Sequence, residues 1–311
     1  MENRLTTSLP PAVSAFHARL SRSLFKSLGE AVSDLSLHYG SAYLDDFERD
    51  LVLLRAAFPE KPWPDWAVQG YIRLNKEILK EEIHFRQTGE YAATPADMGR
   101  VTEDVYDNEE VMDGYYLVGL YGTYFLWPHH YRILEFFRRS FLQVGPPPRR
   151  LAEWGVGHGL LTLEALRRWP EARALIVDLS KYSLGFAGRI LGAAGFAGRC
   201  ESRQGDVLKF TDLPTVDRII CSELLEHVPD PGLLLDRLRE ALVPGGLAYL
   251  TGAINAAQPD HVYLFTSDRQ LFRLLEDHGF AIKASLTASH PNREADENPP
   301  AVVAMVVEAA A

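Results

Sequence analysis

The chain has 311 residues, of which 47% are hydrophobic and 24% charged, the balance of a globular protein with one large or two medium domains. A formal net charge of −10 and a pI near 5.5 argue against a nucleic-acid or anionic-membrane surface, because such a surface needs a basic stripe. The two cysteines, Cys200 and Cys221, are too few for a disulfide framework and suit a reducing cytoplasm, where we expect the protein to reside.

The first half of the chain has the apolar periodicity of helices. The N-terminus lacks the continuous apolar stretch of a signal peptide, and the most apolar segment, 115–127, is too short to cross a membrane. Two stripes at helical spacing are Val13, Phe16, Leu20, Leu24 and Leu28, then Leu44, Phe47, Leu51, Leu54 and Phe58. Asp65 is the predicted N-cap of a helix carrying Tyr71, Ile78 and Ile83. Another helix is predicted after Pro128, with Ile133, Phe137 and Phe141 on one side. The run Gly145-Pro-Pro-Pro148 ends this helical subdomain.

From residue 149 onward short apolar runs alternate with helical stretches. The predicted strands include 151–154, 174–177, 218–221, 247–251, 281–286 and 301–307. Asp230-Pro231 begins one helix, and Ser267 with Gln270 caps the next, which ends at Gly279. This alternation predicts βαβ units, and hence an α/β fold with a mostly parallel, doubly wound sheet. The last two strands are joined by a polar loop without a helix, so we expect them to pair antiparallel.

A glycine-rich turn follows the first of these strands, in Glu153-Trp-Gly155-Val-Gly157-His-Gly159, and a helix over 160–169 comes next. Glycines at a strand-to-helix turn let the backbone approach a ligand closely. A tight turn without a ligand is the plainer alternative. Acidic residues then follow successive strands: Asp178 ends the second, Asp206 follows a third strand that begins near Cys200, and Glu223 follows the fourth, over 218–221. Val207 and Ser222 are their neighbours in the chain. Because the carboxyl ends of parallel strands meet at one edge of a sheet, these residues predict a ligand site there.

These ordered motifs resemble those of the class I S-adenosylmethionine-dependent methyltransferases. The resemblance covers roughly residues 150–310 and rests on EWGVGHG, the strand-ending Asp178, GD at 205–206, SELLEHVPDP, and LVPGG. It implies a Rossmann-like seven-stranded sheet whose last strand is inserted antiparallel. It also implies that Glu153, Gly155, Gly157 and Gly159 line the amino-acid end of S-adenosyl-L-methionine. By the same resemblance Asp178 holds the ribose, Asp206 and Val207 hold the adenine, and Ser222 and Glu223 face the cofactor near its methyl group.

A dinucleotide-dependent dehydrogenase is an alternative, since its glycine loop is similar. Its fingerprint is G-x-G-x-x-G, whereas this chain has G-x-G-x-G preceded by an acidic residue. A carboxylate at Glu153 suits a sulfonium cation and is unfavourable beside a pyrophosphate. Spacing and charge therefore both favour the methyltransferase.

Methyl transfer to a protonated nucleophile can use a general base, and three residues near the predicted sheet edge are candidates. His227 follows the fourth strand, although a structural role within its turn is the interpretation that we favour. His261 and Tyr263 lie in the connection after the fifth strand, which is longer than packing requires, and long loops at this edge usually contact substrate.

The segment Tyr115–Tyr131 is unusually rich in aromatic residues. It predicts either a buried seam between the helical subdomain and the sheet or a pocket wall, with Tyr121, Tyr124 and one of His129 and His130 as substrate-binding candidates. The ten histidines show no ligand-like spacing, so we expect no metal. The pairs Arg138-Arg139 and Arg149-Arg150 are predicted to lie at the surface; an arginine in the pocket would favour an anionic substrate.

We therefore predict two parts, a helical cap on the substrate side over residues 1–148 and an S-adenosylmethionine-binding domain over 149–311. The expected function is methyl transfer to an O-, N- or C-nucleophile of a small molecule in biosynthetic or secondary metabolism. Two alternatives remain, a protein or peptide methyltransferase and a non-catalytic cofactor-binding protein. No nucleic-acid or membrane partner is expected. The sequence leaves the oligomeric state open, a homodimer included.

Overall fold

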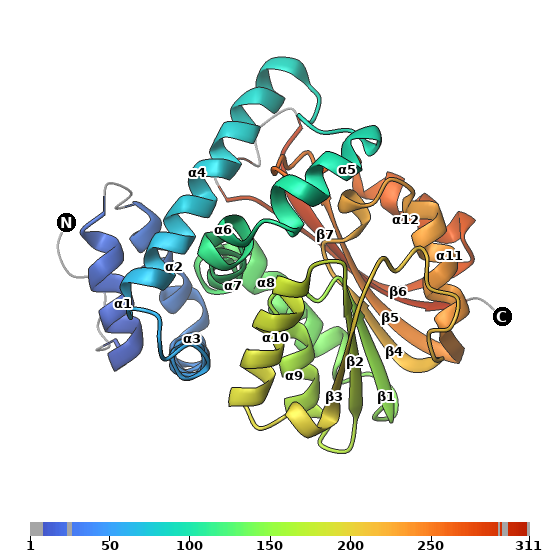
Figure 1. Cartoon of the computed structure of the whole chain (residues 1–311), viewed down its shortest axis with the longest axis horizontal. Coiled ribbons are helices and arrows are strands. Elements are labelled where there is room, and N and C mark those ends of the chain that lie inside the picture. Colours follow the sequence, from blue (N-terminus) through green and yellow to red (C-terminus); the bar gives the residue numbers. More distant parts are fainter. Residues whose placement is uncertain (1–8, 24–26, 292, 294–297, 310–311) are drawn as a thin grey trace.

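The strands predicted in the second half of the chain form one seven-stranded sheet in the computed structural model, which describes residues 9–23, 27–291, 293 and 298–309 (Figure 1). The strands are β1 (Arg150–Trp154), β2 (Arg173–Asp178), β3 (Cys200–Gln204), β4 (Val216–Cys221), β5 (Leu242–Ile254), β6 (Phe280–Ser289) and β7 (Ala301–Ala309). Their order is β3-β2-β1-β4-β5-β7-β6. Strand β7 pairs antiparallel with both β5 and β6, which confirms the predicted final hairpin.

Helices cover both faces of this sheet, as βαβ connections require. They are α9 (Leu160–Arg168), α10 (Lys181–Ala193), α11 (Pro231–Ala241) and α12 (Asp268–Asp277), with short 3₁₀ turns η5 (Ala197–Arg199) and η6 (Leu225–His227). Alternate residues of β7 enter the two cores: Val302 and Val306 pack on the face of α9 and α10, and Val303 and Val307 on the face of α11 and α12. The Rossmann-like α/β prediction is therefore confirmed.

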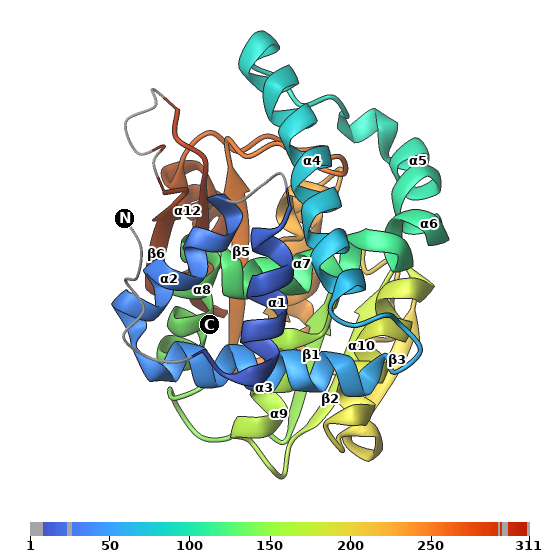
Figure 2. The same ribbon diagram turned by 90° about the vertical axis from the view of Figure 1, so that its left-hand side faces the viewer.

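The first half is helical, as predicted. Its long helices are α1 (Pro11–Ser21), α2 (Ser27–Tyr39), α3 (Ser41–Ala57), α4 (Asp65–Thr88), α7 (Leu117–Leu126) and α8 (Pro128–Phe136). Between α4 and α7 lie short turns: η1 (Pro95–Asp97), α5 (Met98–Val101), η2 (Thr102–Tyr106), α6 (Glu109–Val111) and η3 (Met112–Tyr116). Two of them, η2 and η3, are π-helical, and a third π-helical turn, η4 (Phe137–Phe141), continues α8. Figure 2 shows α3 crossing in front of α9, and the short turns above α10.

The predicted helix boundaries hold with two differences. Pro128 begins α8, and Ser267 caps α12 by accepting a hydrogen bond from the backbone N–H of Gln270. Asp65 is not a cap, because Pro64 precedes the helix and Asp65 is its first residue, with its carboxylate paired to Arg19. The first apolar stripe is divided between α1 and α2. Leu24 lies outside the described residues, as does the side chain of Leu28.

The helices of the first half share one apolar core with α9, α10 and one face of the sheet. Phe58, directly after α3, packs against Phe186 of α10 with ring centroids 4.6 Å apart. The hydroxyl of Tyr249 in β5 donates to the carbonyl of Ile133 in α8 at 3.3 Å. The division of the chain at residue 148 into a cap and a methyltransferase domain stays a prediction. Among the described residues, no helix has both the length and the apolar character needed to cross a bilayer.

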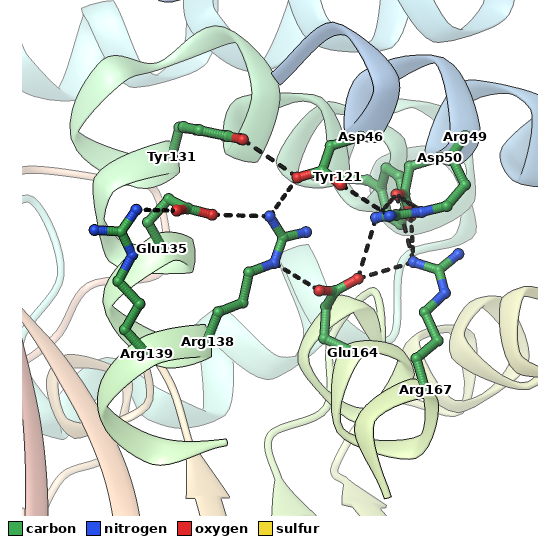
Figure 3. A network of polar contacts seen from close by, with 10 residues as sticks. All are labelled: Asp46, Arg49, Asp50, Tyr121, Tyr131, Glu135, Arg138, Arg139, Glu164 and Arg167. Atoms are coloured by element: carbon green, nitrogen blue, oxygen red, sulfur yellow. Dashed lines mark hydrogen bonds and ion pairs between the residues drawn. The ribbon is translucent and has the colours of Figure 1, made fainter. Parts of the chain in front are cut away.

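An ionic network also joins α3, α8 with η4, and α9 (Figure 3). Arg138 donates to Glu164 at 2.6 Å and pairs with Asp46 and Glu135, while Glu164 also accepts from Arg167 at 2.8 Å. Burial raises the pKa of Glu164, but its arginine neighbours, Arg138 first, outweigh this effect and lower it overall. The prediction of a surface position was wrong for Arg138, whose side chain is 17% exposed, and right for Arg139, at 73%.

Candidate active site

The glycine loop between β1 and α9 turns sharply, with φ of +69° at Gly155, +50° at Gly157 and +76° at Gly159. The backbone N–H of Gly155 donates to the carbonyl of Val177 at 2.8 Å, which holds the loop beside the end of β2. A Cβ at Gly157 would meet no atom within 4 Å, whereas one at Gly159 would come within 2.8 Å of Ala187 in α10. Gly157 therefore leaves space open, and Gly159 permits the close packing of α9 and α10.

Glu153 is the next-to-last residue of β1, just before this loop, and is 3% exposed. Its carboxylate accepts hydrogen bonds from the backbone N–H of Thr162, at 2.9 Å, and from the Thr162 hydroxyl. Burial raises the pKa of Glu153 to about 8. A cation arriving next to this group would favour its ionised form.

Asp178 and Asp206 lie at the ends of the next two strands. The two carboxylate oxygens of Asp178 accept from the backbone N–H groups of Gly157 at 3.0 Å and Ser180 at 2.8 Å, and burial raises its pKa to about 6. Asp206 accepts from the backbone N–H of Leu208 at 3.0 Å and pairs with Lys209. Asp206 is therefore held by the backbone of its own turn, and Asp178 by its own turn and by the glycine loop.

At the end of β4, Glu223 adopts a left-handed conformation with φ of +51°. Its backbone N–H donates to the hydroxyl oxygen of Thr251 at 2.8 Å, and this hydroxyl in turn donates to the Glu223 carboxylate at 2.5 Å. The Ser222 hydroxyl lies 2.9 Å from the same oxygen of Thr251. One threonine of β5 thus positions both residues predicted to face the methyl group.

A cavity of about 670 Å³ joins these strand ends to the N-terminal helices. Eleven of the sixteen predicted site residues line it: Glu153, Gly155, Gly157, Asp178, Asp206, Val207, Ser222, Glu223, His227, Tyr124 and His130. Gly159, Tyr121, His129, His261 and Tyr263 are not among its lining residues in the described part of the chain. The role predicted for each of the sixteen stays a prediction.

The five predicted residues that do not line the cavity contact other parts of the protein. Gly159 contacts α10, as described above. The Tyr121 hydroxyl donates to the buried Asp50 at 2.8 Å, within the seam between α3 and α9. His129 stacks on Trp127 with ring centroids 5.3 Å apart. Tyr263 lines a separate depression with Asp230 and His278.

His261 is fully buried behind His227, and their rings meet edge to face with centroids 4.7 Å apart. The Nδ1 of His261 donates to the carbonyl oxygen of Ala256 at 2.7 Å. Burial lowers the pKa of His261 to about 3.

The opposite wall of the cavity combines the start of the predicted aromatic segment with earlier residues that the sequence did not single out. Its residues come from α5, η2, η3 and α7, and include Met98, Thr102, Tyr106, Met112, Tyr116, Leu117 and Leu120. Their approach to the sheet edge depends on contacts between residues distant in sequence, so periodicity alone could not reveal it. His158, inside the glycine loop, was also missed, although its position next to Gly157 was a usable signal.

Both interpretations of the aromatic segment apply, on different faces. Leu117, Leu120 and Tyr124 follow one another at helical spacing toward the cavity, while Tyr121 and Phe125 face the seam. Helix geometry also separates the two adjacent histidines, and only His130 lines the cavity.

A group of polar side chains surrounds Asp260 at the end of this wall. Asp260 is fully buried and lines the cavity. Its Oδ2 accepts hydrogen bonds from the hydroxyls of Tyr106 at 3.1 Å and Tyr116 at 2.5 Å. His227 Nδ1 lies 3.0 Å from the Asp260 carbonyl oxygen and 3.1 Å from the Tyr106 hydroxyl. The Ser180 hydroxyl donates to the carbonyl of Tyr106 at 2.6 Å, which connects this wall to the turn that carries Asp178.

The comparisons with known proteins agree with this geometry. Residues 152–246 match the family model described as a methyltransferase domain. Trans-aconitate 2-methyltransferase of Methylobacterium nodulans is 29% identical over 146 residues, or 47% of this chain and 52% of that protein. Ubiquinone biosynthesis O-methyltransferase of Psychrobacter cryohalolentis is 26% identical over 144 residues, or 43% of this chain and 52% of that protein. The chain thus spans about half the length of the curated relatives it matches.

Among solved structures, a phosphoethanolamine N-methyltransferase 2 of Haemonchus contortus has a similar fold. The two structures superimpose with a TM-score of 0.51 at 13% sequence identity. The matched region covers 63% of this chain and 59% of the other. With the strand order 3-2-1-4-5-7-6, these matches identify a class I S-adenosylmethionine-dependent methyltransferase domain over residues 152–246.

The residues present fit the cofactor that this fold binds. The cavity stays open at Gly157, where a side chain would project into free space, and carboxylates from three successive strand ends line it. A surplus of carboxylates suits a ligand that carries a sulfonium cation.

Proposed function

We propose that the chain transfers the methyl group of S-adenosylmethionine to a small molecule with a largely apolar body and a hydroxyl-bearing end. The observation that carries this proposal is the single cavity shared by the strand-end carboxylates and the wall from α5 to α7. Its volume falls within the ~300–1,000 Å³ typical of small-ligand pockets. A peptide acceptor would need a more open groove.

Glu153, Asp178 and Asp206 are the residues that would hold the cofactor, with Glu223 and Ser222 near its reactive end. When bound, S-adenosylmethionine supplies a methyl group attached to a good leaving group. The protein then has to align the acceptor and exclude water, and such orientation contributes up to ~7–11 kcal/mol in favourable cases.

The acceptor side of the cavity combines apolar and polar surfaces. Met98, Met112 and Leu117 offer contacts to an apolar body, and the Asp260 group with Tyr106, Tyr116 and His227 offers hydrogen bonds to a hydroxyl. This polar end favours an oxygen nucleophile over nitrogen or carbon.

Charge further restricts the acceptor. Among the described residues that line the cavity, Lys209 is the sole lysine or arginine, and it pairs with Asp206. A tricarboxylate such as the substrate named for the trans-aconitate methyltransferases would meet an excess of carboxylates here. We therefore favour a neutral phenol or enol over a polyanion.

The test uses purified protein with methyl-labelled S-adenosylmethionine and mass spectrometry. The acceptor panel contains neutral phenols, amines, trans-aconitate and a protein lysate. We expect label in a neutral phenolic acceptor. Label in lysate protein alone would overturn the small-molecule proposal, and no transfer beside intact cofactor binding would favour a non-catalytic protein.

A further inference from the structure

Three side chains capable of binding a metal converge at the wall of the cavity. Glu226 and His227 belong to η6, and His261 belongs to the connection after β5. One donor atom of each lies within 4.8 Å of those of the other two. The backbone holds the segments together, because the carbonyl of Glu226 accepts from the N–H groups of Val262 at 2.9 Å and Tyr263 at 3.0 Å.

Hydrogen bonding orients both imidazoles for ligation. The Nδ1 of His261 is 2.7 Å from the Ala256 carbonyl oxygen, and that of His227 is 3.0 Å from the Asp260 carbonyl oxygen. A carbonyl can only accept, so each Nδ1 carries a proton, which leaves Nε2 as the ring atom that can bind a metal. Metal-binding histidines usually have this arrangement. In the described part of the chain, the buried Nε2 of His261 has no hydrogen-bond partner.

The carboxylate of Glu226 is fully buried. It lies near the backbone N–H groups of Glu226 and Ala253 and near the Glu223 carboxyl group, but neither oxygen makes a hydrogen bond of normal geometry to any described group. A buried carboxylate without a partner is unfavourable unless it is protonated or faces a cation.

We propose that Glu226, His227 and His261 bind a divalent transition-metal ion such as Zn²⁺ or Mn²⁺. Two imidazoles and one carboxylate are a donor set for such ions and leave a coordination position open, whereas Mg²⁺ prefers oxygen ligands. The three donor atoms lie within 4.8 Å of one another. Bonds of ~2.0–2.2 Å to a shared ion would bring them closer together than this. The sequence-based expectation of no metal considered only spacing along the chain.

The site borders the acceptor side, because His227 lines the cavity, while Glu226 and His261 are not among its described lining residues. An oxygen-binding role rests on the proposed function: the open position on the side of His227 would bind the hydroxyl oxygen of the acceptor and hold it toward the methyl group.

The experiment measures metal binding directly. Untagged protein is treated with a chelator, dialysed against Zn²⁺ or Mn²⁺, and measured for metal content, with Mn²⁺ titrations followed by electron paramagnetic resonance. We expect one equivalent per chain. Glu226→Gln and His261→Ala should each weaken binding by more than the ~10–100-fold that loss of an outer-shell partner costs. His278→Ala is the matched control, because His278 pairs with Asp236 away from the cluster and should retain full binding.

Wild-type protein that binds no stoichiometric metal overturns the proposal, as do both cluster variants binding like the wild type. Circular dichroism checks their folding. If a variant unfolds, nitrogen couplings to Mn²⁺ in the wild type decide, since two imidazole ligands must produce them.

This assay contains neither cofactor nor acceptor, so it is independent of methyl transfer. Stoichiometric metal without transfer to any acceptor leaves the metal site standing and overturns the proposed function. Full transfer by metal-free protein overturns the oxygen-binding role.

Discussion

At the scale of single residues, the carboxylates of the cavity are fixed before any ligand arrives. Asp178 accepts one backbone hydrogen bond on each oxygen, from Gly157 and Ser180. Each oxygen keeps a further lone pair, so the side chain can accept from two ribose hydroxyls without rotating.

Asp178→Ala should therefore weaken S-adenosylmethionine binding by ~10-fold or more, because hydrogen bonds to a charged acceptor contribute ~1.5–3 kcal/mol each. Calorimetric titration measures the effect. Asp212→Ala, which removes an exposed partner of Arg203, is the control and should bind normally. Unchanged affinity in Asp178→Ala would refute the ribose assignment.

The cofactor-binding role proposed for Glu153 predicts that S-adenosylmethionine affinity depends on pH. Burial raises its pKa to about 8, so below that pH the free protein carries a proton that a bound cation displaces. Affinity should then rise with pH by up to ~10-fold per unit below pH 8 and level off above it. Calorimetry between pH 6 and 9 in two buffers detects the released proton. Glu153→Gln should flatten the profile, and an equal slope in that variant would assign the proton elsewhere.

At the scale of elements, the short turns between α4 and α7 build the cavity wall that we propose for the acceptor. Two of them are π-helical, a geometry frequent at functional sites, and they contribute Thr102, Tyr106, Met112 and Tyr116. The wall reaches the sheet edge through the hydroxyl contacts of Tyr106 and Tyr116 with Asp260.

Tyr116→Phe removes one of the two hydroxyls that hold Asp260. Loss of a hydrogen bond to a charged group costs ~1.5–3 kcal/mol, so kcat/KM for the acceptor should fall ~10-fold or more. The dissociation constant of S-adenosylmethionine should stay the same, because Tyr116 belongs to the acceptor side. Steady-state kinetics and calorimetry provide the two readouts. A larger dissociation constant for S-adenosylmethionine together with an unchanged kcat would contradict this role.

The elements also differ in how well the sequence predicts them. The strands, the glycine turn and the acidic strand ends follow from local patterns, since each needs only its neighbours in the chain. Tyr106 and Asp260 meet across 154 positions, and no local pattern encodes that contact. The cluster of Glu226, His227 and His261 likewise forms only once η6 pairs with the connection after β5.

At the scale of the whole molecule, a shared core and an ionic network unite the helical half with the sheet. Arg138 lies between Asp46 of α3 and Glu164 of α9 (Figure 3). Its neighbour Arg139 pairs only with Glu135 among the described residues and is largely exposed.

Arg138→Met should destabilise the protein by about 2–4 kcal/mol, because partly buried carboxylates lose their cation. Arg139→Met should cost less than about 1 kcal/mol, as exposed pairs usually do. Urea unfolding of the two variants measures the difference. Equal effects would show that the network does not stabilise the junction between the halves.

The continuous core has a consequence for how this architecture can diversify. Helices α1 to α3 belong to the same apolar core as α10 and the sheet, so changes to their buried faces should also destabilise the cofactor half. The short turns over residues 95–116 are different, since several of their side chains project into the cavity. Substitutions in about twenty consecutive positions could therefore redirect the molecule to another acceptor while the nucleoside-binding edge stays as it is.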